Sequence, residues 1–394
     1  MNPPEAIRRY FQHHASKLEK QLIDLVTEMV RQRTVNVIPE KLSEHPYLKV
    51  RGEEYRMAEI VKREFARLSI SFDEFARQKE RPNIIGKLGK NRSGRRLLIP
   101  AHMDVVPAGD GWDHDPFDVV VKDGKLYGRG TNDNKGPLAA LLLAAEVIKQ
   151  LQLDQHITGQ LLIAALSDEE AADPNGLDCG IGYLLAERLI DPTHAIVPDI
   201  GYEMKEIDIA EKGRLVIKIT AIGQQAHGST PEKGINAIFM MAKLLPEIEG
   251  LRLEYEPHPL LGAPTLNLGE IHGGIAANVV PANCSIYLDI RTVPGMNKTN
   301  ILHQLQQCID RVPNGHFKIE TLSESFAFSV PAENELVRLI QKYTEQELGF
   351  KATPIGMGAA PMRKILFNME SLPSDGALAV IPHTRPMSIL KFNN

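Results

Sequence analysis

The chain has 394 residues, which at roughly 150 residues per domain indicates two or three compact units with room for an enclosed site. Hydrophobic residues make up 43% and charged residues 24%, values that exclude a wholly disordered or fibrous protein. The 45 basic and 50 acidic side chains give a formal charge of −5 without a cluster of Lys and Arg, so we expect no nucleic-acid partner.

The first half of the chain alternates amphipathic helices with short buried strands. Helical spacing of apolar residues predicts one helix over 18–29 and another over 54–68. Apolar runs bounded by Gly and Pro predict strands over 83–88, 96–106 and 160–166, with a helix over 137–151 between them. This alternation indicates an α/β/α domain, a sheet with helices on its faces, in which functional side chains gather where strands end.

From about Lys212 the pattern becomes that of a second domain. Strands are predicted over 214–221, 265–271, 284–291 and 317–322, and helices over 236–249 and 298–311. The order β-α-β-β-α-β predicts a ferredoxin-like α+β domain inserted into the first. A further helix over 333–347 returns the chain to the first domain. We therefore expect a discontinuous first domain at 1–211 and 324–394 and an inserted domain at 212–323.

Cysteine content and the N-terminal residues indicate the compartment. Cys179, Cys284 and Cys308 are too few and too scattered for a disulfide framework or a Cys-rich zinc site, so we expect buried thiols in a reducing environment. Residues 1–21 are charged and lack the apolar core of a signal peptide. The longest near-apolar stretch, 137–145, is shorter than the roughly 18 residues that a membrane helix needs. We expect a cytoplasmic protein without a membrane partner.

The segment Ala101-His102-Met103-Asp104 ends one of the predicted strands. Residues two apart in a strand point to the same side, so Asp104 can hydrogen-bond the ring nitrogen of His102 that does not face a ligand. Such a pair suits a metal ligand and the carboxylate that orients it. The alternative is a surface histidine beside a solvated aspartate, a common occurrence for so short a pattern.

Two other segments offer carboxylates at comparable places. The glycine-punctuated loop 128–136 carries Asp133 directly before a helix, where it could bridge two cations or merely interact with the helix N-terminus. The segment Ser167-Asp168-Glu169-Glu170 follows a buried run, where three carboxylates are costly unless a cation gathers them. In a dinuclear site one of two adjacent carboxylates can bind metal while the other accepts a proton from water. A solvated acidic turn is the alternative for this segment.

Two more potential ligands stand outside these segments. Asp199, in Val197-Pro198-Asp199, follows another apolar stretch and could supply an oxygen ligand. His383 stands alone near the C-terminus, and its spacing by itself favours a structural histidine.

Taken together, these segments resemble the dinuclear zinc exopeptidases and N-acyl-amino-acid hydrolases, the family that includes glutamate carboxypeptidase, aminoacylase, acetylornithine deacetylase and succinyl-diaminopimelate desuccinylase. The resemblance implies that the first domain is a catalytic α/β/α domain and that the inserted domain is a lid that makes a homodimer. The matching stretches follow the family's order and cover nearly the whole chain: 101–107, 111–117, 128–136, 168–170, 226–231, 234–238, 273–281 and 289–291.

The resemblance also implies a role for each candidate residue. Asp133 would bridge two divalent metal ions, most simply zinc, with cobalt or manganese as alternatives. The remaining metal ligands would be His102, Glu170, Asp199 and His383. Glu169 would be the general base, Asp104 would orient His102, and His227 would stabilise the oxyanion from the partner subunit. Asn278 and Arg291 would bind the free carboxylate of the substrate.

The implied function is a dizinc metallohydrolase that cleaves the amide bond of N-acyl amino acids or small peptides with a metal-activated water. The sequence has no Gly-x-Ser-x-Gly elbow, which disfavours a covalent serine nucleophile. It departs from the family at Pro100, at Pro361, where an acidic residue is usual, and in the short glycine segment 374–376 before His383. These departures support an alternative: a non-catalytic, metal-containing family member that binds amino-acid-like or peptide ligands.

Overall fold

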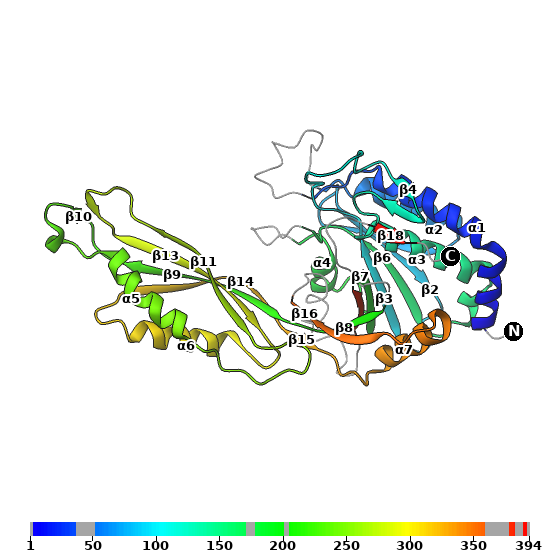
Figure 1. Cartoon of the computed structure of the whole chain (residues 1–394). Coiled ribbons are helices and arrows are strands. Elements are labelled where there is room, and N and C mark those ends of the chain that lie inside the picture. Colours follow the sequence, from blue (N-terminus) through cyan, green and yellow to red (C-terminus); the bar gives the residue numbers. More distant parts are fainter. Residues whose placement is uncertain are drawn as a thin grey trace. The chain divides into compact units, whose positions relative to one another are not determined.

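The computed structural model describes residues 3–36, 52–170, 178–200, 205–358, 378–382 and 389–391. The chain divides into two compact units. The first comprises Met1–Asp208, Ala332–Pro354 and Pro361–Asn394, and the second comprises Ile209–Pro331 and Ile355–Ala360. Figure 1 shows a mixed helix-and-sheet architecture for the first unit and a sheet with two helices for the second, so the expected fold class is confirmed.

The first unit is built on a mixed sheet with the strand order β1-β2-β6-β3-β7-β17-β8. The central strands β6, β3, β7 and β17 run parallel, whereas β1, β2 and β8 pair antiparallel with their neighbours. Parallel strands are typically covered on both faces, and the continuous burial of residues 162–166 agrees with this rule. The strand bounds are Ser71–Ala76 for β1, Pro82–Leu88 for β2, Arg96–His102 for β3, Gln160–Leu166 for β6, His194–Ile200 for β7, Glu206–Glu211 for β8 and Leu378–Pro382 for β17.

Three helices of the first unit share one hydrophobic core with this sheet. The core joins residues such as Met29 of α1, Phe65 of α2 and Leu138 of α3 to Ile163 of β6. Helix α2 lies so close to β2 that a Cβ atom built on Gly86 would approach the Phe65 ring to 2.4 Å, which explains the glycine there. The helices of this unit are α1 (Pro3–Val30), α2 (Tyr55–Arg67), α3 (Lys135–Gln150), α4 (Ile181–Ala186) and α7 (Glu335–Leu348), with a 3-10 turn at Leu153–His156.

Strand β3 shows how Pro100 is accommodated within a central strand. All seven residues of β3 pair with β6, and Pro100 lies opposite Ala164. On its other side, β3 pairs with β7 only at Leu97 and Leu98, before the proline. The ladder to β7 therefore ends before Pro100, which lacks an N–H to donate. A small separate sheet of this unit contains β4 (Val120–Lys122), β5 (Lys125–Tyr127) and β18 (Ile389–Lys391).

The second unit has the predicted β-α-β-β-α-β order. Its four-stranded antiparallel sheet has the order β11-β13-β9-β14, and helices α5 and α6 contribute Leu244 and Leu305 to a core with Ile219 and Ile286 of the sheet. The elements are β9 (Gly213–Ile222), β10 (Ala226–His227), α5 (Ala237–Gly250), β11 (Thr265–Gly273), β12 (Val279–Val280), β13 (Asn283–Thr292), α6 (Lys298–Asp310) and β14 (Phe317–Ser325), with a 3-10 turn at Pro231–Lys233. Strand β8 continues past Asp208 into this unit, where its residues Ala210 and Glu211 pair with the short strand β15 (Phe328–Ser329). The short strand β16 (Thr353–Met357) also pairs with β8.

The structure also bears on the cysteines and on the search for a membrane helix. All three cysteines are buried and unpaired, as expected. Among the described residues, no helix has both the length and the apolar character needed to cross a membrane.

Candidate functional site

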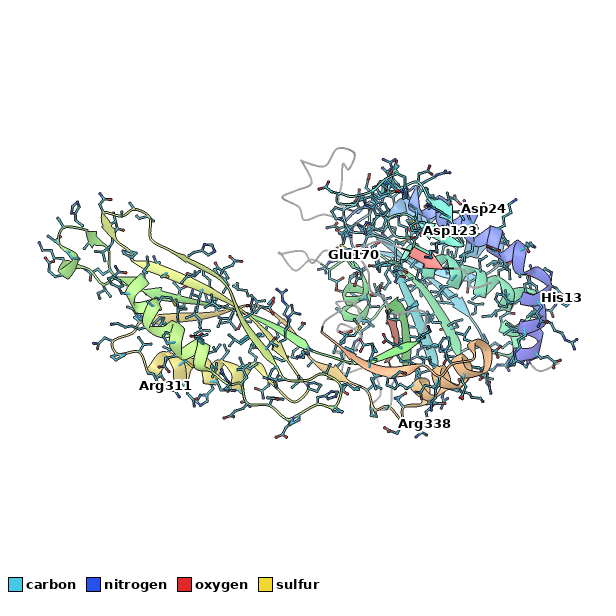
Figure 2. The ribbon with its side chains drawn as sticks, viewed as in Figure 1. His13, Asp24, Asp123, Glu170, Arg311 and Arg338 are labelled. Carbon is cyan, nitrogen blue, oxygen red and sulfur yellow. The ribbon has the colours of Figure 1, made fainter. Side chains whose placement is uncertain are left out.

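The candidate residues of the first unit gather where parallel strands end. His102 is the last residue of β3, and Glu169 and Glu170 lie just beyond β6. Asp199 lies near the end of β7, and Asp133 lies two residues before α3. Strands β6, β3 and β7 are parallel, so their carboxyl ends meet at one edge of the sheet, where functional groups collect in such folds. Figure 2 labels Glu170 at this edge.

The imidazole of His102 lies at the centre of this group. It is fully buried, and its Nε2 atom lies 2.8 Å from Asp133 Oδ1 and 3.4 Å from Asp199 Oδ1. Glu169 Oε2 is 3.9 Å from the same nitrogen. Burial lowers the pKa of His102, yet hydrogen bonds to the surrounding aspartates outweigh it and hold this pKa well above its ordinary value. The interpretation of His102 as a surface residue is therefore wrong.

Asp104 faces the other side of the His102 ring. Strand β3 ends at His102, so the two residues do not share a strand as we had predicted. Asp104 nevertheless reaches the predicted ring nitrogen, because its backbone oxygen lies 3.0 Å and its Oδ1 3.5 Å from the Nδ1 atom of His102. Although burial raises the pKa of Asp104, hydrogen bonding and the charges of His102 and Arg81 hold it below its ordinary value. Asp104 is thus a buried carboxylate that orients the ring.

The acidic segment after β6 is largely buried. The side chain of Glu169 is 9% exposed, which rules out a solvated turn at that residue. Burial, together with the surrounding carboxylates, raises the pKa of Glu169 well above its ordinary value and that of Glu170 to about 8. Burial thus disfavours the charged form of both carboxylates, and the neighbouring carboxylates add to this effect.

The donor set fits a divalent metal ion. One ligand atom each from His102, Asp133 and Glu170 lies within 4.8 Å of the other two. Imidazole and carboxylate ligands, without thiolates, are typical of open catalytic zinc sites. The same ligands also bind cobalt and manganese. A cation here would compensate the carboxylates whose pKa values are raised. His383 lies outside the described residues, as do Pro361 and the glycine segment 374–376.

Two asparagines that the sequence patterns did not single out hold this group together. Asn134 donates from Nδ2 to Asp199 Oδ1 at 2.7 Å, and Asn36 donates from Nδ2 to Asp104 Oδ2 at 2.7 Å. Asn134 lay inside the glycine loop that we had selected, so its position was a usable signal. Asn36 is distant in sequence from every motif, and no local pattern marks it.

The three remaining candidates lie in the second unit, two of them at the separate two-stranded sheet of β10 and β12 and one on the four-stranded sheet. His227 of β10 pairs with Val279, and Asn278 accepts the N–H of Gly228 at 2.8 Å, so His227 and Asn278 are neighbours. Arg291 lies near the end of the ten-residue strand β13, where its Nε donates to Asp289 Oδ1 at 2.8 Å. At about 3.3 Å per residue, roughly 25 to 30 Å separates the two ends of that strand.

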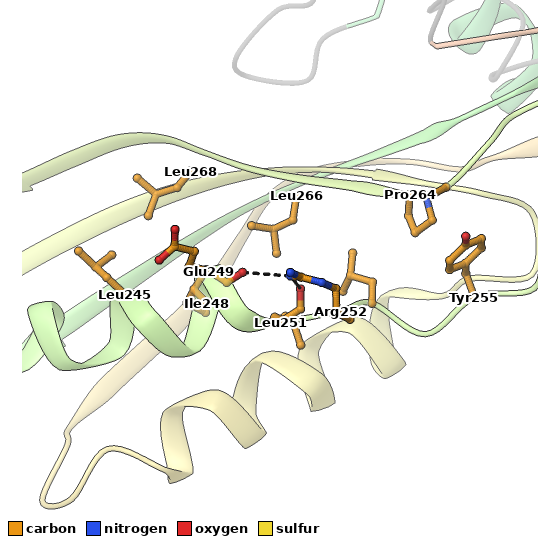
Figure 3. A pocket seen from close by; sticks show the side chains of 11 residues that line it. Leu245, Ile248, Glu249, Leu251, Arg252, Tyr255, Pro264, Leu266 and Leu268 are labelled. Carbon is orange, nitrogen blue, oxygen red and sulfur yellow. Dashed lines mark hydrogen bonds between the residues drawn. The ribbon is translucent and has the colours of Figure 1, made fainter.

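A cavity of about 700 Å³ also belongs to the second unit. Figure 3 shows it between α5 and β11, where it is lined by apolar residues such as Leu245 and Leu266. Its arginine, Arg252, already donates to the backbone oxygens of Glu249 and Leu251. No candidate catalytic residue lines this cavity, so we do not assign it to the reaction.

Each of the two units contains a segment that matches a known protein family. A peptidase dimerisation domain matches residues 209–316, and peptidase family M28 matches residues 83–200. The acetylornithine deacetylase of Proteus mirabilis is 34% identical over 283 residues, which are 69% of this chain and 69% of that protein.

Two solved structures share the fold. A tripeptidase from Staphylococcus aureus has a TM-score of 0.65 and 21% identity, with 92% of this chain and 89% of that chain covered. An M20 family metallo-carboxypeptidase from Sulfolobus solfataricus has a TM-score of 0.63 and 16% identity, with 91% and 90% covered.

Proposed function

Because the chain belongs to the M20 peptidase family, we propose that it binds two divalent metal ions and hydrolyses the amide bond of N-acyl amino acids. The observation that carries this proposal is the convergence of His102, Asp133 and Glu170 within 4.8 Å beside the buried Glu169. Identity to a deacetylase favours acylated amino acids over peptides as the first substrates to test.

The residues that would hold the ions are those that the resemblance implies. Asp133 would bridge them, and its carboxylate is half exposed beside the buried His102. His102 and Glu170 would be further ligands, and Asp199, held by Asn134, would supply another oxygen. His383 would complete the set. Bound zinc, or cobalt or manganese in its place, would supply Lewis-acid activation of the scissile carbonyl and of the attacking water.

The residues of the chain supply proton transfer and orientation. Glu169 takes the proton of the attacking water and delivers it to the leaving amine; its burial raises its pKa, which increases its proton affinity. Asp104 fixes the His102 ring through Nδ1, which would leave Nε2, beside Asp133, to bind a metal ion. His227 stabilises the oxyanion that develops on the carbonyl oxygen, and Asn278 and Arg291 bind the substrate carboxylate.

The experiment that tests this function is a substrate panel. Protein reconstituted with zinc, cobalt or manganese is incubated with N-acetyl amino acids, N-succinyl amino acids and dipeptides, and the released amine is measured. We expect metal-dependent release from at least one acylated amino acid and about two metal ions per chain. Bound metal without turnover of any substrate would contradict hydrolysis and favour the non-catalytic ligand-binding protein.

We also propose that the second unit forms a homodimer. Asn278 precedes β13, which begins at Asn283, and Arg291 lies eight residues further along that strand, about 26 Å at 3.3 Å per residue, too far to hold one small carboxylate together with Asn278 of the same chain. Contribution of His227 and Asn278 from the partner subunit removes this conflict.

An apolar surface suits this dimer. At the start of α5 and the end of β11, five large apolar side chains are 38% to 80% exposed, and we call them the lid patch: Ile235, Ile238, Phe239, Ile271 and Ile275. Strand β11 pairs on one side only, with β13, so it is an edge strand of the sheet.

Replacing Phe239 by glutamate should therefore convert the dimer into monomers. Phe239 is 68% exposed, so the change introduces a charge into the interface without disturbing the core of the unit. Light scattering after size exclusion measures the mass, and activity should fall together with it because the partner's His227 is lost. The control is Leu322→Glu, at a 51% exposed position on β14, the opposite edge of the same sheet, which should remain dimeric. A dimeric Phe239→Glu variant would contradict the lid patch as the interface.

A further inference from the structure

A buried ionic cluster includes the first carboxylate of the acidic segment that follows β6. Arg81 is 1% exposed and is among the largest fully buried side chains of the described residues. Its Nη2 atom lies 2.5 Å from Glu54 Oε1, and its Nη1 atom lies 2.9 Å from Asp168 Oδ1. The carboxylates of Glu54 and Asp168 are 0% and 3% exposed. None of these three residues belongs to the metal ligands or to the general base proposed above.

The cluster fixes the backbone as well as the side chains. Asp168 has a φ of +65°, a left-handed conformation that residues with a Cβ atom seldom adopt. Its backbone N–H donates to Glu54 Oε1 at 3.2 Å, and its Oδ2 accepts the N–H of Cys179 at 3.1 Å. Asp168 is therefore held at its backbone N–H by Glu54, at Oδ1 by Arg81 and at Oδ2 by the Cys179 N–H.

The next two residues are held from the opposite side. The N–H groups of Glu169 and Glu170 both donate to the carboxylate of Asp104, each to Oδ2 at 3.0 Å. Asn36 links the two halves, since its Nδ2 lies 2.7 Å from Asp104 Oδ2 and 3.3 Å from Asp168 Oδ1. The left-handed turn at Asp168 thus determines how the chain leaves β6 and reaches Asp104.

We propose that Arg81, Glu54 and Asp168 are positioning residues, which hold the turn after β6 so that Glu169 and Glu170 point to the reaction centre and the metal. This inference rests on the proposed function for what Glu169 does. It adds that Arg81, which precedes Asp168 by 87 residues in the sequence, sets the geometry of the acidic segment.

Stability alone is a weak reason for this cluster. Burying an ion pair costs desolvation free energy that the mutual attraction repays only partly, and apolar residues of similar volume often stabilise as well or better. A fork-shaped guanidinium between two carboxylates instead imposes direction, because its donors must meet both partners at fixed angles. Catalysis by a positioned base is sensitive to such direction, since a displacement of about 1 Å can cost roughly 100-fold in rate.

The test compares three variants of the full-length protein: Asp168→Ala, Asp168→Asn and Arg81→Lys. Asparagine tolerates the left-handed backbone and keeps an oxygen for the Cys179 N–H, whereas alanine loses both properties. Lysine keeps the charge but not the fork. We expect kcat to fall at least about 10-fold in Asp168→Ala with KM changed less than about threefold, and asparagine to restore part of the loss. Arg81→Lys should lower kcat in the same way.

A second readout does not depend on turnover. The visible absorption spectrum of bound Co²⁺ reports the geometry of its ligands, so it should change in Asp168→Ala because Glu170 moves. The control is Glu146→Gln, which breaks another ion pair with a buried carboxylate in the first unit, to Arg67 at 2.6 Å, and should lower the melting temperature without changing kcat or the spectrum.

The outcomes separate the two proposals. A wild-type protein that binds Co²⁺ but cleaves no substrate would overturn the proposed function, and the Co²⁺ spectra of the variants would still test the positioning role. Folded Asp168→Ala and Arg81→Lys proteins with wild-type kcat and wild-type Co²⁺ spectra would overturn the positioning role. If Asp168→Ala fails to fold, Asp168→Asn and Arg81→Lys decide by the same criteria.

Discussion

Replacing Glu169 by glutamine should lower kcat by about 100-fold to 10,000-fold, the contribution of a positioned general base. Glutamine has nearly the shape of glutamate but cannot accept the proton of the attacking water. The backbone N–H of residue Glu169 donates to the Asp104 carboxylate, so the side-chain substitution leaves this hydrogen bond in place. Metal content should stay close to that of the wild type, because Glu169 is not among the proposed ligands, and KM should change little.

The measurement is steady-state kinetics on the best substrate of the panel, with metal content determined on the same samples. Glu187→Gln, at an exposed position on the same unit, is the matched control and should keep wild-type kcat. Unchanged kcat in a metal-loaded Glu169→Gln protein would remove Glu169 as the base. A loss of metal together with activity would instead make Glu169 a ligand, which also contradicts the assignment.

The position of His102 and Glu169 at strand ends was accessible from local sequence patterns, whereas the full set of candidate residues came from the family resemblance. His102 and Glu169 come directly after apolar runs, and the ends of parallel strands meet at one edge of a sheet. The order of strands and helices in the second unit was equally readable, since its strands alternate buried and exposed positions.

The groups that hold these residues in place were not accessible in the same way. Glu54 contacts Asp168 across 114 residues of sequence, and Asn36 contacts Asp104 across 68. An arginine before a strand ordinarily lies in solvent, whereas Arg81 is buried between Glu54, directly before α2, and Asp168, after β6. Local periodicity also predicted that Asp104 shares a strand with His102, whereas β3 ends at His102. Such features depend on tertiary contacts, which local periodicity in the sequence does not predict.

Metal removal should abolish activity and also destabilise the first unit. Without a cation, the carboxylates around His102 repel one another, and Glu170 has a pKa raised to about 8. A ligand that binds only the folded state stabilises it by about 2.7 kcal/mol when its free concentration is about 100 times Kd. For a unit of this size that corresponds to a rise in melting temperature of roughly 5 to 10 °C. Calorimetry of chelated and zinc-loaded protein measures the shift.

The same experiment on His102→Ala shows whether the shift comes from this site. His102 supplies the only nitrogen among the three ligand atoms that converge, so its loss should weaken zinc binding by more than about 100-fold and remove most of the stabilisation. His13→Ala, on the exposed surface of α1, should keep both the full shift and the activity. If zinc raised the melting temperature of His102→Ala as much as that of the wild type, the metal would bind elsewhere. The carboxylates around His102 would then be gathered for another cation, such as a cationic group of the substrate.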